Sequence, residues 1–216
     1  MYQPPHFRED RVAVQHALIR TFPLGLLVTA GPGGLMANPV PFTLYEEEGE
    51  RGMLRVHLAR ANPQWRALGA VEECLVVFQG PQEYITPSWY ATKAETGKVV
   101  PTWNYATVHV RARPTVIEDA AWLRRQVDDL TGLAEGRRPA PWQVSDAPSD
   151  FVAAQLKGII GVEMPILAIE GKWKVSQNRN PADRAGVVGG LRHEQREAMA
   201  DLVEAYLTGR APGPGA

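Results

Sequence analysis

The sequence predicts a mainly β fold with peripheral helices (α+β), built as a closed or split antiparallel barrel rather than as a doubly wound parallel sheet. About six segments alternate apolar and polar residues with the period of a β-strand, or form short apolar runs. These segments follow one another closely and are separated by turns that contain glycine and proline. The helical patterns lie between or after them, so we expect helices at the edge of a barrel.

The strand segments share either strict alternation or a short buried apolar run. We predict strands at 24–29, 35–45, 53–59, 73–79 with a continuation at 83–86, 102–117 and 161–176. Pro39 and Pro41 lack the amide hydrogen that a central strand donates, so the second strand should have an edge-like face. Residues 31–34, Gly-Pro-Gly-Gly, suit the hairpin turn between the first two strands.

Helical periodicity and capping residues indicate four helices. We predict them at 10–21, 63–69, 119–130 and 194–207. Asn62 is placed to cap the second helix, which begins at Pro63, and Gly69 stands at its C-terminal end. The segment 136–148 is predicted to be a loop that Trp142 holds in place.

Composition excludes several classes of protein. The 216 residues are 44% hydrophobic and carry a net charge of -1, so the chain can bury a sizeable core and has no overall field for nucleic acid or anionic membranes. We find no secretory signal and no apolar run of ~18 residues, and therefore expect a cytoplasmic protein. The single cysteine, Cys74, lies in an apolar run and is expected to be buried rather than nucleophilic.

The stretch 57–63, His-Leu-Ala-Arg-Ala-Asn-Pro, is the main candidate for an anion site. A helix start offers unpaired backbone amides, Asn62 adds a side-chain partner, and Arg60 can make two parallel hydrogen bonds. A plain capped helix with an exposed arginine explains the same residues. His57 fits either a structural sheet histidine or a ligand contact, and no metal is assigned because no partner stands at metal-ligand spacing.

Two other regions combine aromatic and hydrogen-bonding side chains. Residues 88–90 and 101–105 form either core or a platform for a planar heterocycle, whose polar edge Ser88 or Asn104 would contact. Residues 172–179 form either a solvated strand end or a second anion or flavin contact. We find no nucleophile elbow and no phosphate-binding glycine motif, so no catalytic residue is assigned.

Several segments, taken together, resemble the PaiB family of FMN-binding split-barrel proteins, named for a negative regulator of protease synthesis and sporulation. The matching segments run in family order from the first residue to about Leu191. They are 1–2, 5–7, 57–65, 78–81, 84–90, 100–105, 108–109, 169–172, 174–179 and 183–184. The resemblance implies an FMN-binding split β-barrel related to the pyridoxamine-phosphate oxidase fold, with FMN held between the subunits of a homodimer. The segment 91–99 departs from the family pattern as a longer insertion.

The resemblance also implies which residues bind the cofactor. They are Asn38, Pro39, Val40, His57, Ala59, Arg60, Asn62, Pro63, Trp103, Asn104, Gln177, Asn178 and Arg179. The first three are expected along the isoalloxazine ring, and those from 57 to 63 near the ribityl phosphate. The remaining five are expected to reach the flavin from the same or the neighbouring subunit.

The expected organisation is a split-barrel flavin-binding domain over 1–191, a C-terminal helix over 192–208 and a disordered tail over 209–216. The resemblance implies a negative transcriptional regulator, with DNA or another regulatory macromolecule as partner. Against direct DNA contact, the only basic doublets are 124–125 and 137–138, and no clear helix-turn-helix occurs. The alternatives are a flavin-dependent oxidoreductase acting on a small molecule, and an interaction module without flavin.

Overall fold

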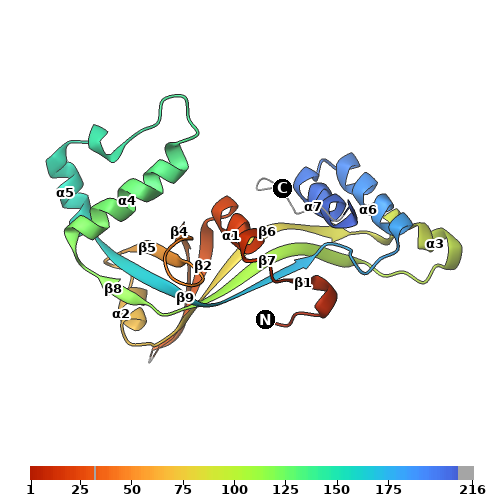
Figure 1. The fold of residues 1–216 in the computed structure, drawn as a ribbon, viewed down its shortest axis with the longest axis horizontal. Helices are drawn as coiled ribbons and strands as arrows, with labels where there is room; N and C mark the ends of the chain where they lie inside the picture. Colours follow the sequence, from red (N-terminus) through yellow and green to blue (C-terminus); the bar gives the residue numbers. More distant parts are fainter. Residues whose placement is uncertain (32, 209–216) are drawn as a thin grey trace. The chain divides into compact units, whose positions relative to one another are not determined.

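Figure 1 shows the fold as a computed structural model that describes residues 1–31 and 33–208. Pro32 of the predicted turn and the predicted tail over 209–216 lie outside the described residues. The strands are β1 (Arg8–Glu9), β2 (Leu24–Gly31), β3 (Gly34–Pro41), β4 (Thr43–Tyr45), β5 (Met53–Ala59), β6 (Cys74–Ile85), β7 (Thr102–Ala112), β8 (Thr115–Ile117) and β9 (Ile159–Lys174). The helices are α1 (Val12–Thr21), α2 (Gln64–Leu68), α3 (Ala91–Thr96), α4 (Ala120–Glu135), α5 (Ser149–Lys157), α6 (Pro181–His193) and α7 (Glu197–Thr208), with 3-10 turns η1 (Pro5–Phe7), η2 (Pro87–Trp89) and η3 (Val144–Asp146).

The strands form an antiparallel sheet in the order β3-β2-β6-β7-β9-β5-β4, and β1 and β8 also pair with β9. The path begins at β3 and ends at β4, and those two strands are not paired with each other in the part of the chain that the structure describes. The barrel is therefore split rather than closed. This confirms the predicted split antiparallel β-barrel with peripheral helices.

The chain folds as two compact units. Unit 1 contains Met1–Phe22, Phe78–His109 and the chain from Glu170 onward, and unit 2 contains Pro23–Val77 and Val110–Ile169. The boundaries fall within β6, β7 and β9, so these three strands contribute to both units. No helix in the described ranges is both long and apolar enough to span a membrane.

In unit 2, β5 has two different faces, as its alternation predicts. Leu54, Val56 and Leu58 are at most 2% exposed and form part of the core. His57 and Arg55 point to the other face, which α4 covers. A Cβ atom at Gly161 of β9, which pairs with His57, would lie 2.3 Å from the Trp122 ring, so only glycine lets α4 pack this closely.

Helix α2 begins one residue later than predicted. The Asn62 side chain accepts a hydrogen bond of 3.0 Å from the Gln64 amide, which satisfies the helix start, while Pro63 stands just outside the helix. Gly69 follows the last helical residue as predicted. The short helix therefore forms as expected, but the Asn62 side chain is bonded to the helix's own Gln64 amide and is not left for a ligand.

Helix α6, in unit 1, is absent from the sequence prediction, as are α3 and α5. Three glycines within α6, at 186, 189 and 190, lower its helix propensity. Its start carries the capping signal nevertheless, because the Asn180 side chain accepts a bond of 2.8 Å from the Asp183 amide. Packing explains two of the glycines: a Cβ at 186 or 190 would lie 2.0 or 2.3 Å from atoms of Trp89.

Helix α7 packs beside α6 (Figure 1) and is joined to the N-terminal segment by a buried acid. The Glu9 carboxylate is 3% exposed, pairs with Arg11 at 2.5 Å and accepts a hydrogen bond from the Tyr206 hydroxyl. Burial alone raises the pKa of Glu9, but these hydrogen bonds outweigh it and hold the pKa below its usual value. The last described helix is thus fixed to the first strand of unit 1.

Two adjacent glycines of α6 give a matched test of this packing. Gly190→Ala places a methyl group against the Trp89 ring, and we expect it to lower the free energy of unfolding by about 1–3 kcal/mol. Gly189→Ala meets nothing within 4 Å and should raise it by about 0.5–1 kcal/mol through helix propensity. Urea unfolding of both variants measures this, and equal effects at the two positions would show that α6 does not pack on Trp89.

Candidate functional site

The structure places the sequence-predicted cofactor residues in two groups, one in each unit. Those from Asn38 to Pro63 lie in unit 2, on β3, on β5 and in the turn before α2. Those from Trp103 onward lie in unit 1, on β7 and in the segment after β9. Each group has its own internal contacts.

In unit 2, Asn38 is joined to a buried polar network that the sequence did not reveal. Its side chain donates a hydrogen bond of 2.8 Å to Gln64, which is 0% exposed. Gln64 in turn donates to the Leu27 carbonyl at 2.9 Å and to the Thr29 hydroxyl at 3.1 Å. The network ties α2 to β2 and β3 and orients Asn38, while Pro39 next to it is exposed and Val40 is buried.

The turn at 59–64 differs from the predicted anion site in its backbone. The Asn62 amide donates to the Ala59 carbonyl at 2.8 Å and the Gln64 amide to the Asn62 side chain. The expectation that these amides are unpaired was wrong, because the turn itself satisfies them. The amides of Asn62 and Gln64 are therefore already used and do not serve an anion.

Arg60 is the cationic side chain of this turn, and it already has partners. It forms an ion pair of 2.9 Å with Glu118 and donates to the carbonyls of Lys157 and Ile159 at 3.2 and 3.4 Å. The Glu118 side chain is 64% exposed. An exposed ion pair contributes only about 0–1 kcal/mol, so a more highly charged anion can displace Glu118 from Arg60.

His57 lies beneath α4 rather than in the turn. Its Nδ1 atom is 2.7 Å from Oε1 of Gln126, a helix residue that is 1% exposed. Because an amide oxygen only accepts hydrogen bonds, this contact fits the tautomer in which Nδ1 carries the proton and Nε2 is an acceptor. The ring lines an apolar cavity of about 240 Å³ between β5, α4 and α5.

The sheet of unit 2 also presents an uncovered apolar face. Opposite residues of an antiparallel pair share a face, and here Leu26 pairs with both Pro39 and Val77, while Val28 pairs with both Ala37 and Leu75. All of these side chains are exposed or half-buried. Towards the ends of the same face, Leu24 is 63% and Leu35 79% exposed. A continuous exposed apolar surface of this kind marks a binding or association site.

In unit 1, Asn104 is fully buried, and within the ranges that the structure describes only one of the two polar atoms of its side chain forms a hydrogen bond. Its Nδ2 donates to the Ser176 hydroxyl at 2.9 Å, but its Oδ1 has no partner in the described structure. Ser176 has a positive φ of 65°, a conformation that costs a non-glycine residue energy. Asn104 therefore lies beneath the surface of unit 1, where Ser176 is the one hydrogen-bond partner of its side chain among the described residues.

The other predicted cofactor residues of unit 1 differ in how far their side chains are exposed to solvent. Trp103 is 53% exposed, and its carbonyl accepts a bond of 2.6 Å from Lys174. Gln177 closes a local turn through Trp173 and Val175, and Asn178 is exposed. The Arg179 guanidinium lies 4.5 Å over the Tyr90 ring, and no carboxylate among the described residues forms a salt bridge with it. It is therefore a cation available to an anionic ligand.

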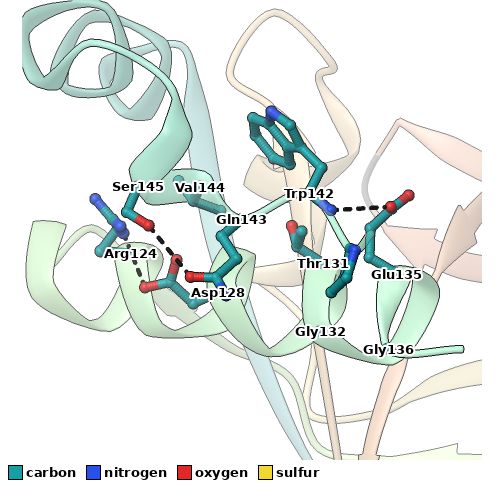
Figure 2. A pocket seen from close by; sticks show the side chains of 11 residues that line it. Arg124, Asp128, Thr131, Gly132, Glu135, Gly136, Trp142, Gln143, Val144 and Ser145 are labelled. Carbon is teal, nitrogen blue, oxygen red and sulfur yellow. Dashed lines mark hydrogen bonds and ion pairs between the residues drawn. The ribbon is translucent and has the colours of Figure 1, made fainter. Parts of the chain in front are cut away.

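A second cavity, of about 470 Å³, lies at the C-terminal half of α4 (Figure 2). Its charged side chains are largely paired within its walls, with Arg124 2.8 Å from Asp128, while Glu135 accepts a bond of 3.2 Å from the Trp142 amide. This bond holds the predicted loop in place at Trp142, although the indole itself is 48% exposed. The cavity has no unpaired buried charge to select a ligand.

Two other predictions concern reactivity and DNA. Cys74 is 4% exposed, and burial raises the pKa of its thiol to about 12, which confirms that it is an inert core residue. In the basic doublets, Arg124 pairs with Asp128, and Arg138 pairs with Glu135 at the end of α4. Each doublet thus has one arginine in an ion pair with an acidic neighbour.

The sequence profile of the family described as "Putative FMN-binding domain" matches residues 1–168. A curated relative from Aspergillus fumigatus, an uncharacterized protein, is 37% identical over 88% of this chain and 90% of its own length. The protease synthase and sporulation protein PAI 2 of Bacillus subtilis is 30% identical over 96% of this chain and 98% of its own length. Among solved structures, the FAD and heme binding protein of Mycobacterium smegmatis has a TM-score of 0.54 at 18% identity, covering 76% of this chain and 71% of its own.

Proposed function

This chain belongs to the PaiB-type family of FMN-binding domains, and from that premise we propose that it is a homodimer that binds FMN and acts as a negative regulator of transcription. The observation that carries the cofactor proposal is the combination, in unit 2, of a replaceable partner on Arg60 with an exposed apolar sheet face. FMN needs both, because it joins a dianionic phosphate to an apolar planar ring. When bound, FMN supplies reversible electron transfer.

The phosphate is proposed to bind Arg60, beside Ala59, Asn62 and Pro63. A guanidinium makes two parallel hydrogen bonds to phosphate, which are stronger than its contact with one exposed carboxylate. Phosphate would thus replace Glu118, which moves into solvent. His57 is not part of this group, because Gln126 holds it beneath α4.

The isoalloxazine ring is proposed to lie along β3 at Asn38, Pro39 and Val40. Pro39 is exposed on the apolar face, whereas the Asn38 side chain points to the opposite face of β3, where Gln64 holds it. The ring is therefore proposed to lie on the Pro39 side of the strand. The residues of unit 1 in the proposed set, Trp103, Asn104, Gln177, Asn178 and Arg179, are proposed to reach a flavin of the same or of the neighbouring subunit. Of these, Trp103, Asn178 and Arg179 are at least partly exposed, and Arg179 brings a cation.

The apolar face of β2, β3 and β6 is proposed as the homodimer interface. A second copy would cover Leu24, Leu26 and Leu35, which otherwise expose apolar surface to water. The face carries no charged side chain at the paired positions 26, 28, 37, 39, 75 and 77. Apolar interface centres of this kind are typical of homodimers.

The regulatory role is proposed from the relative whose name refers to protease synthesis and sporulation, which matches this chain over nearly its full length. The basic doublets offer little for DNA, because each has an acidic neighbour, Asp128 or Glu135, and the whole chain has a net charge of -1. We therefore propose that regulation acts through another macromolecule rather than through these doublets.

An arginine and its acidic partner test the phosphate site. Arg60→Gln should weaken FMN about 10- to 100-fold, the loss of a charge-assisted hydrogen-bond pair, and riboflavin much less. Glu118→Gln removes the competitor and should tighten FMN by up to about fivefold, in line with an exposed ion pair. Flavin fluorescence titrations measure both, and an equal loss of FMN and riboflavin in Arg60→Gln would refute the phosphate role.

The interface is tested by a charge on the apolar face. Leu26→Asp should give a monomer, because a buried unpaired carboxylate costs about several kcal/mol in an interface. Leu133→Asp, on the exposed side of α4 and equally apolar at the outset, is the matched control and should leave the dimer intact. Light scattering after gel filtration reads the mass, and a dimeric Leu26→Asp variant would place the interface elsewhere.

The regulatory proposal is tested by transcript profiling after deletion of the gene in its source organism. We expect a set of transcripts to rise, native protein to restore them, and the Arg60→Gln protein to restore them only in part because it holds less FMN. An unchanged transcript profile would rule out the regulatory role. Steady oxidation of NADH or NADPH by the FMN-loaded protein would identify an oxidoreductase instead.

A further inference from the structure

The cavity of about 240 Å³ under α4 and α5 is not used by the proposed flavin site. It lies within unit 2, between β5, α4, η3, α5 and the start of β9. An apolar protein cavity of about 150 Å³ is known to admit a single benzene ring. This cavity therefore has room for one or two fused rings.

Its lining selects for a neutral molecule. Apolar side chains make up most of the wall, and they are Val127, Trp142, Val144, Ala147, Phe151, Val152, Leu156 and Ile159. Among the residues that the structure describes, no Asp, Glu, Lys or Arg lines it. A charged ligand would lose its hydration without gaining a counter-charge, which costs far more free energy than apolar contact returns.

Two half-exposed aromatic residues stand at this cavity. Trp142 is 48% and Phe151 54% exposed, although both side chains are large and apolar. The Trp142 backbone is anchored by its bond to Glu135, which Figure 2 shows, so the indole is presented from a fixed point. Aromatic walls of this kind favour a flat, apolar ligand.

His57 supplies the main polar group from the sheet. Nδ1 is hydrogen-bonded to the side chain of Gln126, which is itself buried, and this bond fixes the orientation of the imidazole ring. In the tautomer that this contact fits, Nε2 is left to accept a hydrogen bond from a ligand in the cavity that the ring lines. Gln155, the other polar residue of the lining, is exposed and stands on α5.

We propose that this cavity is a binding site for a neutral aromatic molecule of one or two rings that donates an N–H or O–H hydrogen bond to Nε2 of His57. Gln126 is a positioning residue that fixes the acceptor. The site is separate from the proposed FMN contacts on Arg60 and β3, and it does not depend on flavin binding. A ligand here would contact α4 and α5 directly and could stabilise their packing on the sheet.

Indole and 1-methylindole serve as probes, since they differ in the N–H donor. Calorimetric titration of the full-length protein should show that indole binds about 3- to 10-fold more tightly, the effect of one net hydrogen bond. In His57→Phe the two probes should bind within about twofold of each other, because the acceptor is gone. Equal affinities for the native protein, or no binding of either probe at millimolar concentration, would overturn the proposal.

A cavity-filling variant tests the location. Ala147 lines the cavity, and Ala147→Phe should reduce indole affinity at least about tenfold by occupying the space. Ala153 is exposed on α5 and does not line the cavity, so Ala153→Phe is the matched control and should bind indole as the native protein does. Unchanged indole binding by Ala147→Phe would place the site elsewhere, and FMN titration of the same variants reports the flavin site independently.

Discussion

The uncovered apolar face of β2, β3 and β6 is the constraint on which the functional interpretation depends. Antiparallel register brings Leu26, Pro39 and Val77 into one row and Val28, Ala37 and Leu75 into the next. Leaving such a surface in water is unfavourable, so it should be covered by a ligand, by a second chain or by both. A flavin ring and a dimer partner are compatible occupants, because each contributes a flat apolar surface.

Strand β5 lies next to two different candidate sites within unit 2, an apolar cavity and an arginine that can bind an anion. Its inner face, at Leu54, Val56 and Leu58, belongs to the core. Its outer face carries His57, which Gln126 orients towards an apolar cavity under the helices. Just beyond its end, Arg60 makes an exposed and replaceable ion pair. One strand thus borders the cavity for which we propose a neutral aromatic ligand and, just beyond its end, the proposed phosphate site.

Local patterns predicted much of this fold. The alternation of β5 and the buried Cys74 follow from neighbouring residues, and the structure confirms them. The Asn62 side chain accepts a hydrogen bond from the Gln64 amide, but Pro63 rather than Asn62 is the N-cap of α2. Helix α6 was missed because its glycines depress helix propensity, whereas Trp89, distant in sequence, makes them necessary. The hydrogen bonds of Gln64 and Gln126 could not be predicted from the sequence either. Their partners are up to 69 residues away, and no local sequence pattern marks a glutamine that makes such a bond. The spare amides predicted before α2 are absent because the Asn62 side chain already accepts from the Gln64 amide.

We propose that FMN binds to a dimer built on the apolar sheet face. Gel filtration of FMN-loaded protein, with absorbance read at flavin and protein wavelengths and mass read by light scattering, tests it most directly. We expect flavin absorbance to co-elute with a species of two chains at one FMN per chain. Protein that elutes without flavin absorbance, or flavin that stays on a single chain, would contradict it.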